Sequence, residues 1–125
     1  MASANEKEHT AEMNKSIYSG DVLSTAKAVF KPFDNIEFVV GWLPGTIASS
    51  GLGKIAYASI DLNSVQAEMA VIEEIWDRIS PGGMIVLDDY GFGGHEDQNA
   101  AWNAFAAAKG RIILAVPTGQ GILTK

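Results

Sequence analysis

Apolar and polar positions alternate along the chain in a pattern that predicts three helices. Residues 64–80 carry apolar side chains three or four positions apart, as on the buried face of an amphipathic helix. This stripe consists of Val65, Met69, Ile72, Trp76 and Ile79. The acidic residues of the segment, including Glu68, are placed mostly off the stripe. Helices are also expected over 21–31, where Asp21 can cap the first turn, and over 96–109.

Short runs of β-branched and other apolar residues between these helices predict strands. The runs cover residues 36–40, 55–60, 84–87, 111–116 and 122–124. Strands that alternate with helices form a largely parallel sheet. The five residues 117–121 between the last two strands are too few for a parallel crossover, so these strands form an antiparallel hairpin. We therefore expect an α/β fold with a mixed sheet.

Length and composition indicate a protein of one domain and argue against some classes of partner. The 125 residues, 47% of them hydrophobic, are enough for one domain with a core. A net charge of −6 argues against partners such as nucleic acid or an anionic membrane, because both need a basic face. No apolar run approaches the roughly 18 residues of a membrane span, and because the first residues are polar we expect no signal peptide. We expect a cytoplasmic protein with a flexible arm over 1–16 and a domain over 17–125.

Acidic residues follow two consecutive predicted strands. Asp61 ends the strand 55–60, and Asp88 and Asp89 end the strand 84–87. Because one helix joins these strands, we expect them to be neighbours about 4.8 Å apart, with their carboxyl ends at the ligand-binding edge of the sheet. Three carboxylates this close suit Mg²⁺, or the hydroxyls or amine of a ligand. They can equally cap loop N–H groups, and two successive residues of a strand cannot point to the same side.

Two segments occur together that are more specific in combination than apart. One is Ile60-Asp-Leu-Asn63, and the other is Ile79-Ser-Pro-Gly-Gly-Met-Ile-Val-Leu-Asp-Asp-Tyr-Gly91. Together they resemble the macrocin O-methyltransferase-like class I methyltransferases, over about residues 18–125. The resemblance implies a truncated Rossmann-like methyltransferase fold with helices on both faces of the sheet. It also implies S-adenosylmethionine (SAM) as cofactor and, as substrate, a hydroxyl of a sugar or small metabolite; several relatives need Mg²⁺.

The resemblance also assigns ligands. Asp61, Asp88 and Asp89 match the metal-binding aspartates of the family. Gly41 and Trp42 match the loop near the adenine of the cofactor, and Asp61 is grouped with them as a cofactor-binding residue. A bound metal would hold the substrate oxygens and lower the pKa of the attacking hydroxyl.

The catalytic base is where this sequence departs from the family. The family carries an aspartate, thought to be the general base, two residues after the first metal ligand. This chain has Asn63 there, and an amide does not accept a proton at neutral pH. His95 is a substitute, because imidazole titrates in the right range. A histidine in a Gly-Gly-His-Glu loop is alternatively a solvated loop residue.

The resemblance begins at the third strand of the family's domain, here 36–40. The family's first two strands, their glycine-rich turn and the ribose-binding acid find no match. The segments 51–53 and 119–121 have the Gly-x-Gly pattern but come before strands, not after them. Without those strands, 55–60 shows an apolar edge that invites pairing. We expect either that 36–40 pairs with it or that a second copy covers it in a homodimer.

Two other functions compete with catalysis. A non-catalytic, truncated methyltransferase-fold module would act through a partner or a homodimer. A Mg²⁺-dependent phosphoryl-transfer receiver also gathers aspartates at strand ends, but no lysine follows the strand 111–116. Among other side chains, we expect Trp76 and Trp102 in the core and Gln120 to be only a turn residue.

Overall fold

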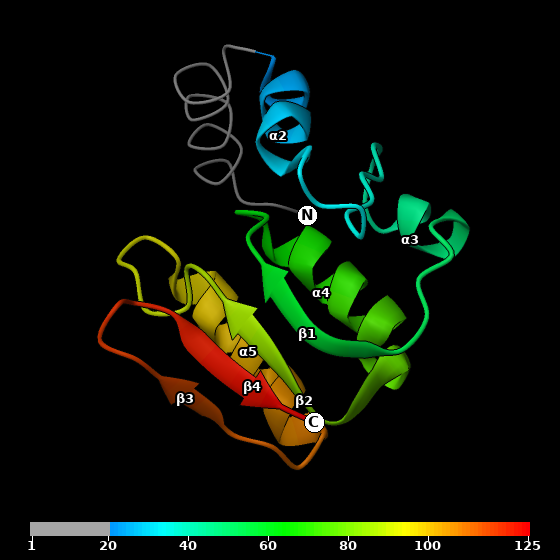
Figure 1. Cartoon of the computed structure of the whole chain (residues 1–125). Coiled ribbons are helices and arrows are strands. Elements are labelled where there is room, and N and C mark those ends of the chain that lie inside the picture. Colours follow the sequence, from blue (N-terminus) through cyan, green and yellow to red (C-terminus); the bar gives the residue numbers. More distant parts are fainter. Residues whose placement is uncertain (1–20) are drawn as a thin grey trace.

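A mixed sheet of four strands forms the centre of the fold (Figure 1). The structure is a computed structural model that describes residues 21–125. Its strands are β1 (Ile55–Ile60), β2 (Ile79–Leu87), β3 (Ile113–Ala115) and β4 (Gly121–Thr124), in the order β1-β2-β4-β3. β1 and β2 are parallel, and β4 is antiparallel to both of its neighbours. The predicted mixed sheet with a C-terminal antiparallel hairpin is confirmed.

The helices form largely where the sequence pattern predicts them. They are α2 (Val22–Phe30), α3 (Gly45–Ser49), α4 (Val65–Ile75) with the 3-10 turn η1 (Trp76–Arg78), and α5 (Glu96–Ala108). Asp21 caps α2, because its Oδ1 accepts the N–H of Ser24 at 3.0 Å. The helix expected over 64–80 ends earlier than predicted. Residues 79–83 already belong to β2, in which Ile79 pairs with Ile55 of β1.

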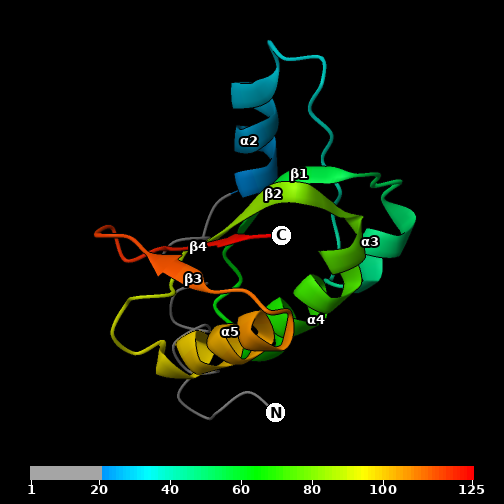
Figure 2. The ribbon, with the colours of Figure 1, turned by 90° about the horizontal axis from the view of Figure 1, so that it is seen from below.

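Helices α4 and α5 lie together on one face of the sheet (Figures 1 and 2). The strand order explains this arrangement. α4 connects β1 to β2 and α5 connects β2 to β3; both connections join parallel strands and move across the sheet in the same direction. Because such crossovers are right-handed, both helices lie on the same face. Helices are expected on both faces of the sheet, and among the described residues α4 and α5 cover one of them. α2 lies on the other side but buries no residue. Tyr57, Met84 and Leu114 on that face are 60%, 39% and 63% exposed.

The segment 36–40 does not form the predicted strand. Its residues have no strand assignment in the described chain, and Val39 and Val40 are 48% and 69% exposed. A β-branched run becomes a strand only when a neighbour accepts its backbone hydrogen bonds, and none is paired with it here. The expected pairing of 36–40 with β1 is therefore wrong for the described residues, since β1 pairs only with β2 there, and the homodimer stays a prediction.

The core lies between the sheet and the pair α4 and α5. Its most deeply buried large side chains are Trp102, Ile72, Ile79, Ile85, Leu87 and Leu123. Trp76 and Trp102 both meet Phe105 edge to face, with ring centroids 5.2 and 5.9 Å apart. The predicted core positions of these two tryptophans are confirmed.

Some expectations concern other parts of the chain or its surroundings. The arm expected over 1–16 lies outside the described residues. Within residues 21–125, none of the helices combines the length and the apolar character that a membrane crossing needs.

Truncation of Leu123 tests the position of the core. Leu123 is fully buried on the central strand β4, so Leu123→Ala should lower the free energy of unfolding by about 2–5 kcal/mol. Leu114→Ala, on the exposed face of β3, is the matched control and should change it by about 0.5 kcal/mol or less. Urea denaturation followed by tryptophan fluorescence measures both. Equal losses in the two variants would contradict this packing.

Candidate functional site

The acidic residues lie at one edge of the sheet, as the sequence predicts. β1 and β2 are parallel neighbours, and Ile60 pairs with Leu87 at their carboxyl ends. The N–H of Asp88 donates to the carbonyl of Ile60 at 3.1 Å, which fixes the two strand ends beside each other. Asp61 and the pair Asp88–Asp89 therefore leave the sheet from adjacent strands on the same side.

Asp61 and Asn63 form a small hydrogen-bonded loop in front of α4. Asn63 Nδ2 donates to Asp61 Oδ1 at 3.2 Å. Asn63 has a φ of 51°, in the left-handed region that asparagine tolerates better than most residues. Ser64 follows it and caps α4 by accepting the N–H of Ala67 at 3.4 Å. Asn63 thus turns the chain into the helix and orients the exposed Asp61 carboxylate.

Asp88 is held by the turn between β3 and β4. Gln120 Nε2 donates to Asp88 Oδ1 at 2.8 Å, and the N–H of Gly91 donates to the carbonyl of Gly119 at 2.6 Å. Gly119 has a φ of 89°, and a Cβ there would meet the ring of Phe92 at 2.6 Å. The two loops are therefore clasped together, with glycine required at the closest approach. The expectation that Gln120 is only a turn residue is wrong.

Asp89 turns the other way, toward α5. Its Oδ2 atom is buried and lies 3.9 Å from Nδ1 of His95. The same ring nitrogen contacts Oε1 of Gln98, one turn further along α5. His95 is therefore not a solvated loop residue: its side chain is 14% exposed and belongs to a polar cluster under the edge of the sheet.

A buried carboxylate, Glu68 on α4, ends this cluster. Glu68 is 4% exposed, and it accepts from Gln98 Nε2 at 2.8 Å and from Trp102 Nε1 at 2.7 Å. Burial raises the pKa of the Glu68 carboxyl above its usual value, the hydrogen bonds from these two side chains oppose the rise, and the charge of Asp89 adds to it. The backbone N–H of Leu62 also bonds to this carboxylate. Glu68 therefore contacts both α5 and the loop that carries Asp61.

The sequence interpretation missed Glu68. It placed the acidic residues mostly off the apolar stripe of the helix, whereas Glu68 packs beside Val71, Ile72 and Ile75 on the buried face. A signal was present: Glu68 lies three residues after Val65 and four before Ile72, a spacing that puts it inside the stripe. An acid at such a position marks a buried, hydrogen-bonded group.

The three aspartates do not form a metal centre in this arrangement. Their partners are Asn63 for Asp61, Gln120 for Asp88 and His95 for Asp89. No three histidine, aspartate or glutamate side chains within residues 21–125 are grouped so that they could hold a metal ion. The side chains as placed do not fit Mg²⁺, because each carboxylate is turned to a protein partner.

Gly41 and Trp42 lie in the connection between α2 and β1. Trp42 is 92% exposed, and a Cβ at Gly41 would overlap the side chain of Thr46, so only glycine fits this turn. An indole this exposed can stack on an adenine ring. The assignment of Gly41 and Trp42 to the adenine of a cofactor stays a prediction.

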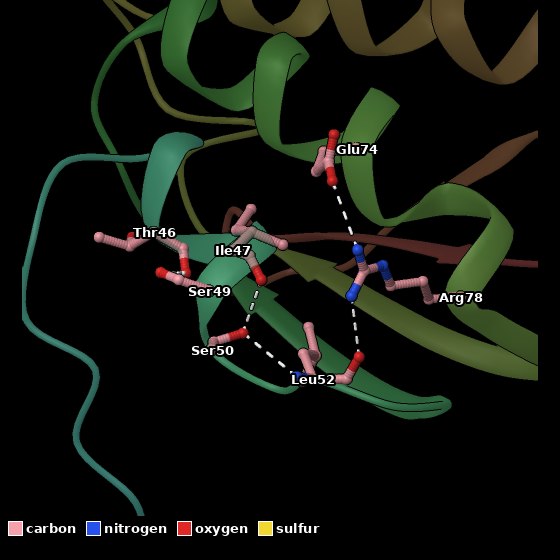
Figure 3. Close-up of polar contacts among 7 residues, drawn as sticks. All are labelled: Thr46, Ile47, Ser49, Ser50, Leu52, Glu74 and Arg78. Carbon is pink, nitrogen blue, oxygen red and sulfur yellow. Dashed lines mark hydrogen bonds and ion pairs between the residues drawn. The ribbon is translucent and has the colours of Figure 1, made fainter.

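The connection itself is anchored to the body of the fold (Figure 3). Arg78 Nη1 donates to the carbonyl of Leu52 at 2.8 Å, and Nη2 bonds to Glu74 at 3.4 Å. Ser50 Oγ donates to the carbonyl of Ile47 at 2.8 Å, and Ile47 is buried. The segment that follows Trp42 is therefore a folded element and not a loose loop.

Sequence comparison decides the family. Residues 3–113 match the model of a family described as Macrocin-O-methyltransferase (TylF). The chain belongs to the macrocin O-methyltransferase family. Membership in this family implies SAM as the methyl donor.

Two curated relatives are O-methyltransferases by name. The mycinamicin III 3''-O-methyltransferase of Micromonospora griseorubida is 32% identical over 89 residues, which cover 64% of this chain and 35% of the relative. The 8-demethyl-8-(2,3-dimethoxy-alpha-L-rhamnosyl)-tetracenomycin-C 4'-O-methyltransferase of Streptomyces olivaceus is 30% identical over 57 residues, which cover 46% of this chain and 22% of the relative. The chain spans less than half the length of either relative.

The pH dependence of stability tests the environment of Glu68. Because its pKa is raised on folding, the folded chain binds this proton more tightly than the unfolded chain does. The stabilisation is complete below the unfolded pKa of 4.5 and is lost as the pH rises through the folded value. The free energy of unfolding of the wild type, relative to Glu68→Gln, should therefore rise as the pH falls from about 7 toward 4.5.

Urea titrations at a series of pH values measure this difference. Glu73→Gln, on the exposed side of the same helix, is the control and should show no such trend. A difference between wild type and Glu68→Gln that stays constant with pH would contradict the assigned environment.

Proposed function

We propose that residues 17–125 are part of a Rossmann-like class I methyltransferase domain that methylates a hydroxyl of a sugar or small metabolite in the cytoplasm, with SAM as donor. One observation supports this most: Asp61 and the pair Asp88–Asp89 leave adjacent parallel strands at one edge of the sheet. In open α/β sheets this edge is where ligands bind. The family match and the names of the two relatives agree with it.

Some residues of the chain are proposed to bind the methyl donor, and others to act on the methyl acceptor. SAM, when bound, supplies an electrophilic methyl group. Trp42 would stack on its adenine, Gly41 allows the turn that presents the indole, and the exposed Asp61 carboxylate would accept hydrogen bonds from ligand hydroxyls. Together these residues would hold the cofactor near the carboxyl ends of β1 and β2.

His95 is the proposed general base. If the acceptor oxygen displaces the sulfur of SAM from the methyl carbon, S-adenosylhomocysteine leaves and the hydroxyl must lose its proton, which an imidazole is suited to take. Asn63 cannot take it, because an amide has no basic site at neutral pH. Asn63 instead positions Asp61 through the 3.2 Å hydrogen bond.

Binding of Mg²⁺ by Asp61, Asp88 and Asp89 stays a prediction. It requires that Asp88 leaves Gln120 and that Asp89 turns away from His95. Addition of Mg²⁺ to the binding experiment tests whether this rearrangement occurs.

A second candidate function rests on the exposed face of the sheet. Tyr57, Met84 and Leu114 lie on the face opposite α4 and α5, and β1 has an unpaired edge among the described residues. Apolar surface next to a free strand edge is typical of an interface. In this alternative, the chain is a non-catalytic module that pairs with a second copy of itself.

Calorimetry with S-adenosylhomocysteine separates the two functions. The first predicts binding by the full chain, and Trp42→Ala should weaken it about tenfold, as expected for loss of one base–aromatic stack. Ile112→Ala, which removes another strongly exposed apolar side chain, is the control and should bind as the wild type does. Titrations with and without Mg²⁺ report on the aspartates.

Failure to bind at millimolar concentration would contradict the methyltransferase function. A mass by light scattering of twice 13.3 kDa would then support the homodimeric module, and a monomer would exclude it.

A further inference from the structure

An unbroken series of buried polar contacts runs from α4 to the candidate base. Trp102 Nε1 lies 2.7 Å from Glu68 Oε2, and Gln98 Nε2 lies 2.8 Å from Glu68 Oε1. Gln98 Oε1 then contacts Nδ1 of His95. Glu68 and Gln98 are each 4% exposed, so solvent does not replace these partners.

The order of donors and acceptors in this series is fixed from its buried end. An indole N–H can only donate, and a carboxylate can only accept. Gln98 must therefore turn its NH₂ group toward Glu68 and its carbonyl oxygen toward His95. The reverse orientation would place two acceptor oxygens against each other in a buried site and leave both without a donor.

The orientation of Gln98 determines which ring nitrogen of His95 carries the proton. An amide oxygen only accepts, so Nδ1 must be the N–H. The Asp89 carboxylate, 3.9 Å from the same nitrogen, favours the same form. In the neutral ring, Nε2 is then the nitrogen with the lone pair that a general base needs.

We propose that Glu68 is a positioning residue which, through Gln98, holds His95 as the Nδ1–H tautomer and so makes Nε2 the ring nitrogen that can accept a proton. The tautomer follows from the contacts alone, and only its use in proton transfer rests on the proposed methyltransferase function. Burying a carboxylate between two helices costs desolvation free energy, and a pair of apolar side chains would pack the helices equally well. The acid at this position is explained if Glu68 sets the order of hydrogen-bond donors and acceptors between Trp102 and His95.

The tautomer of His95 is measurable in the full chain by ¹⁵N NMR of the imidazole nitrogens. The experiment is done at alkaline pH, because the tautomer is defined only for a neutral imidazole. The chain has two histidines, His9 and His95, so His9→Gln assigns the signals. The proposal predicts a protonated Nδ1 and an unprotonated Nε2 in His95, the opposite of the form that free imidazole side chains favour.

Exchange of carboxylate and amide groups makes the test specific. In Glu68→Gln, the new amide must offer its oxygen to Trp102 and its NH₂ to Gln98, which then turns its own NH₂ toward His95. Nδ1 becomes an acceptor, so the proton should move to Nε2. In the double variant Glu68→Gln/Gln98→Glu, a carboxylate again faces Nδ1, and the Nδ1–H form should return.

A matched control separates polarity from stability. Ile72→Val weakens the packing of the same helix without changing a polar group, so its His95 should keep the wild-type tautomer. A wild-type His95 in the Nε2–H form, or a Glu68→Gln variant with an unchanged tautomer, would overturn the proposal. Loss of S-adenosylhomocysteine binding would contradict the methyltransferase function and leave the tautomer result as it is.

Discussion

The buried carboxylate of Glu68 is the interaction on which the rest of this structure depends. It joins α4 to α5 through Gln98 and Trp102, and it bonds to the backbone of Leu62 next to Asp61. In a low-dielectric interior such bonds are strong when every member is satisfied and costly when one is lost. Glu68 therefore fixes how the two helices pack and, at the same time, where both acidic loops of the candidate site lie.

A second set of hydrogen bonds holds the loop after β2 against the turn between β3 and β4. Gln120 holds Asp88, and the backbones of Gly91 and Gly119 bond across the two loops. The successive residues Asp88 and Asp89 thus point to different neighbours, one to the β3–β4 turn and the other to α5. Two carboxylates of one strand end are separated in this way, which limits their repulsion.

Much of this arrangement could be predicted from the sequence, because local patterns control it. Helical periodicity identifies α4 and α5, the short last connection requires the hairpin, and the strand order brings Asp61 beside Asp88. The segment 36–40 could not be judged locally, because a strand needs a partner as well as a β-branched run. The hydrogen bonds of Gln120 and Gln98 could not be predicted for a related reason. Their partners are 32 and 30 residues away in the chain, and no local pattern reveals such a contact.

The central claim is that a buried Glu68–Trp102 bond ties the two helices below the site, and hydrogen exchange of the indole N–H groups tests it most directly. Trp102 Nε1–H is bonded to a carboxylate in the core, whereas Trp42 is 92% exposed. The account predicts that the Trp102 indole proton exchanges about a hundredfold or more slowly than that of Trp42, because it exchanges only when the helix pair opens. Exchange of both indole protons at the same rate, while the backbone amides of α5 stay protected, would contradict it.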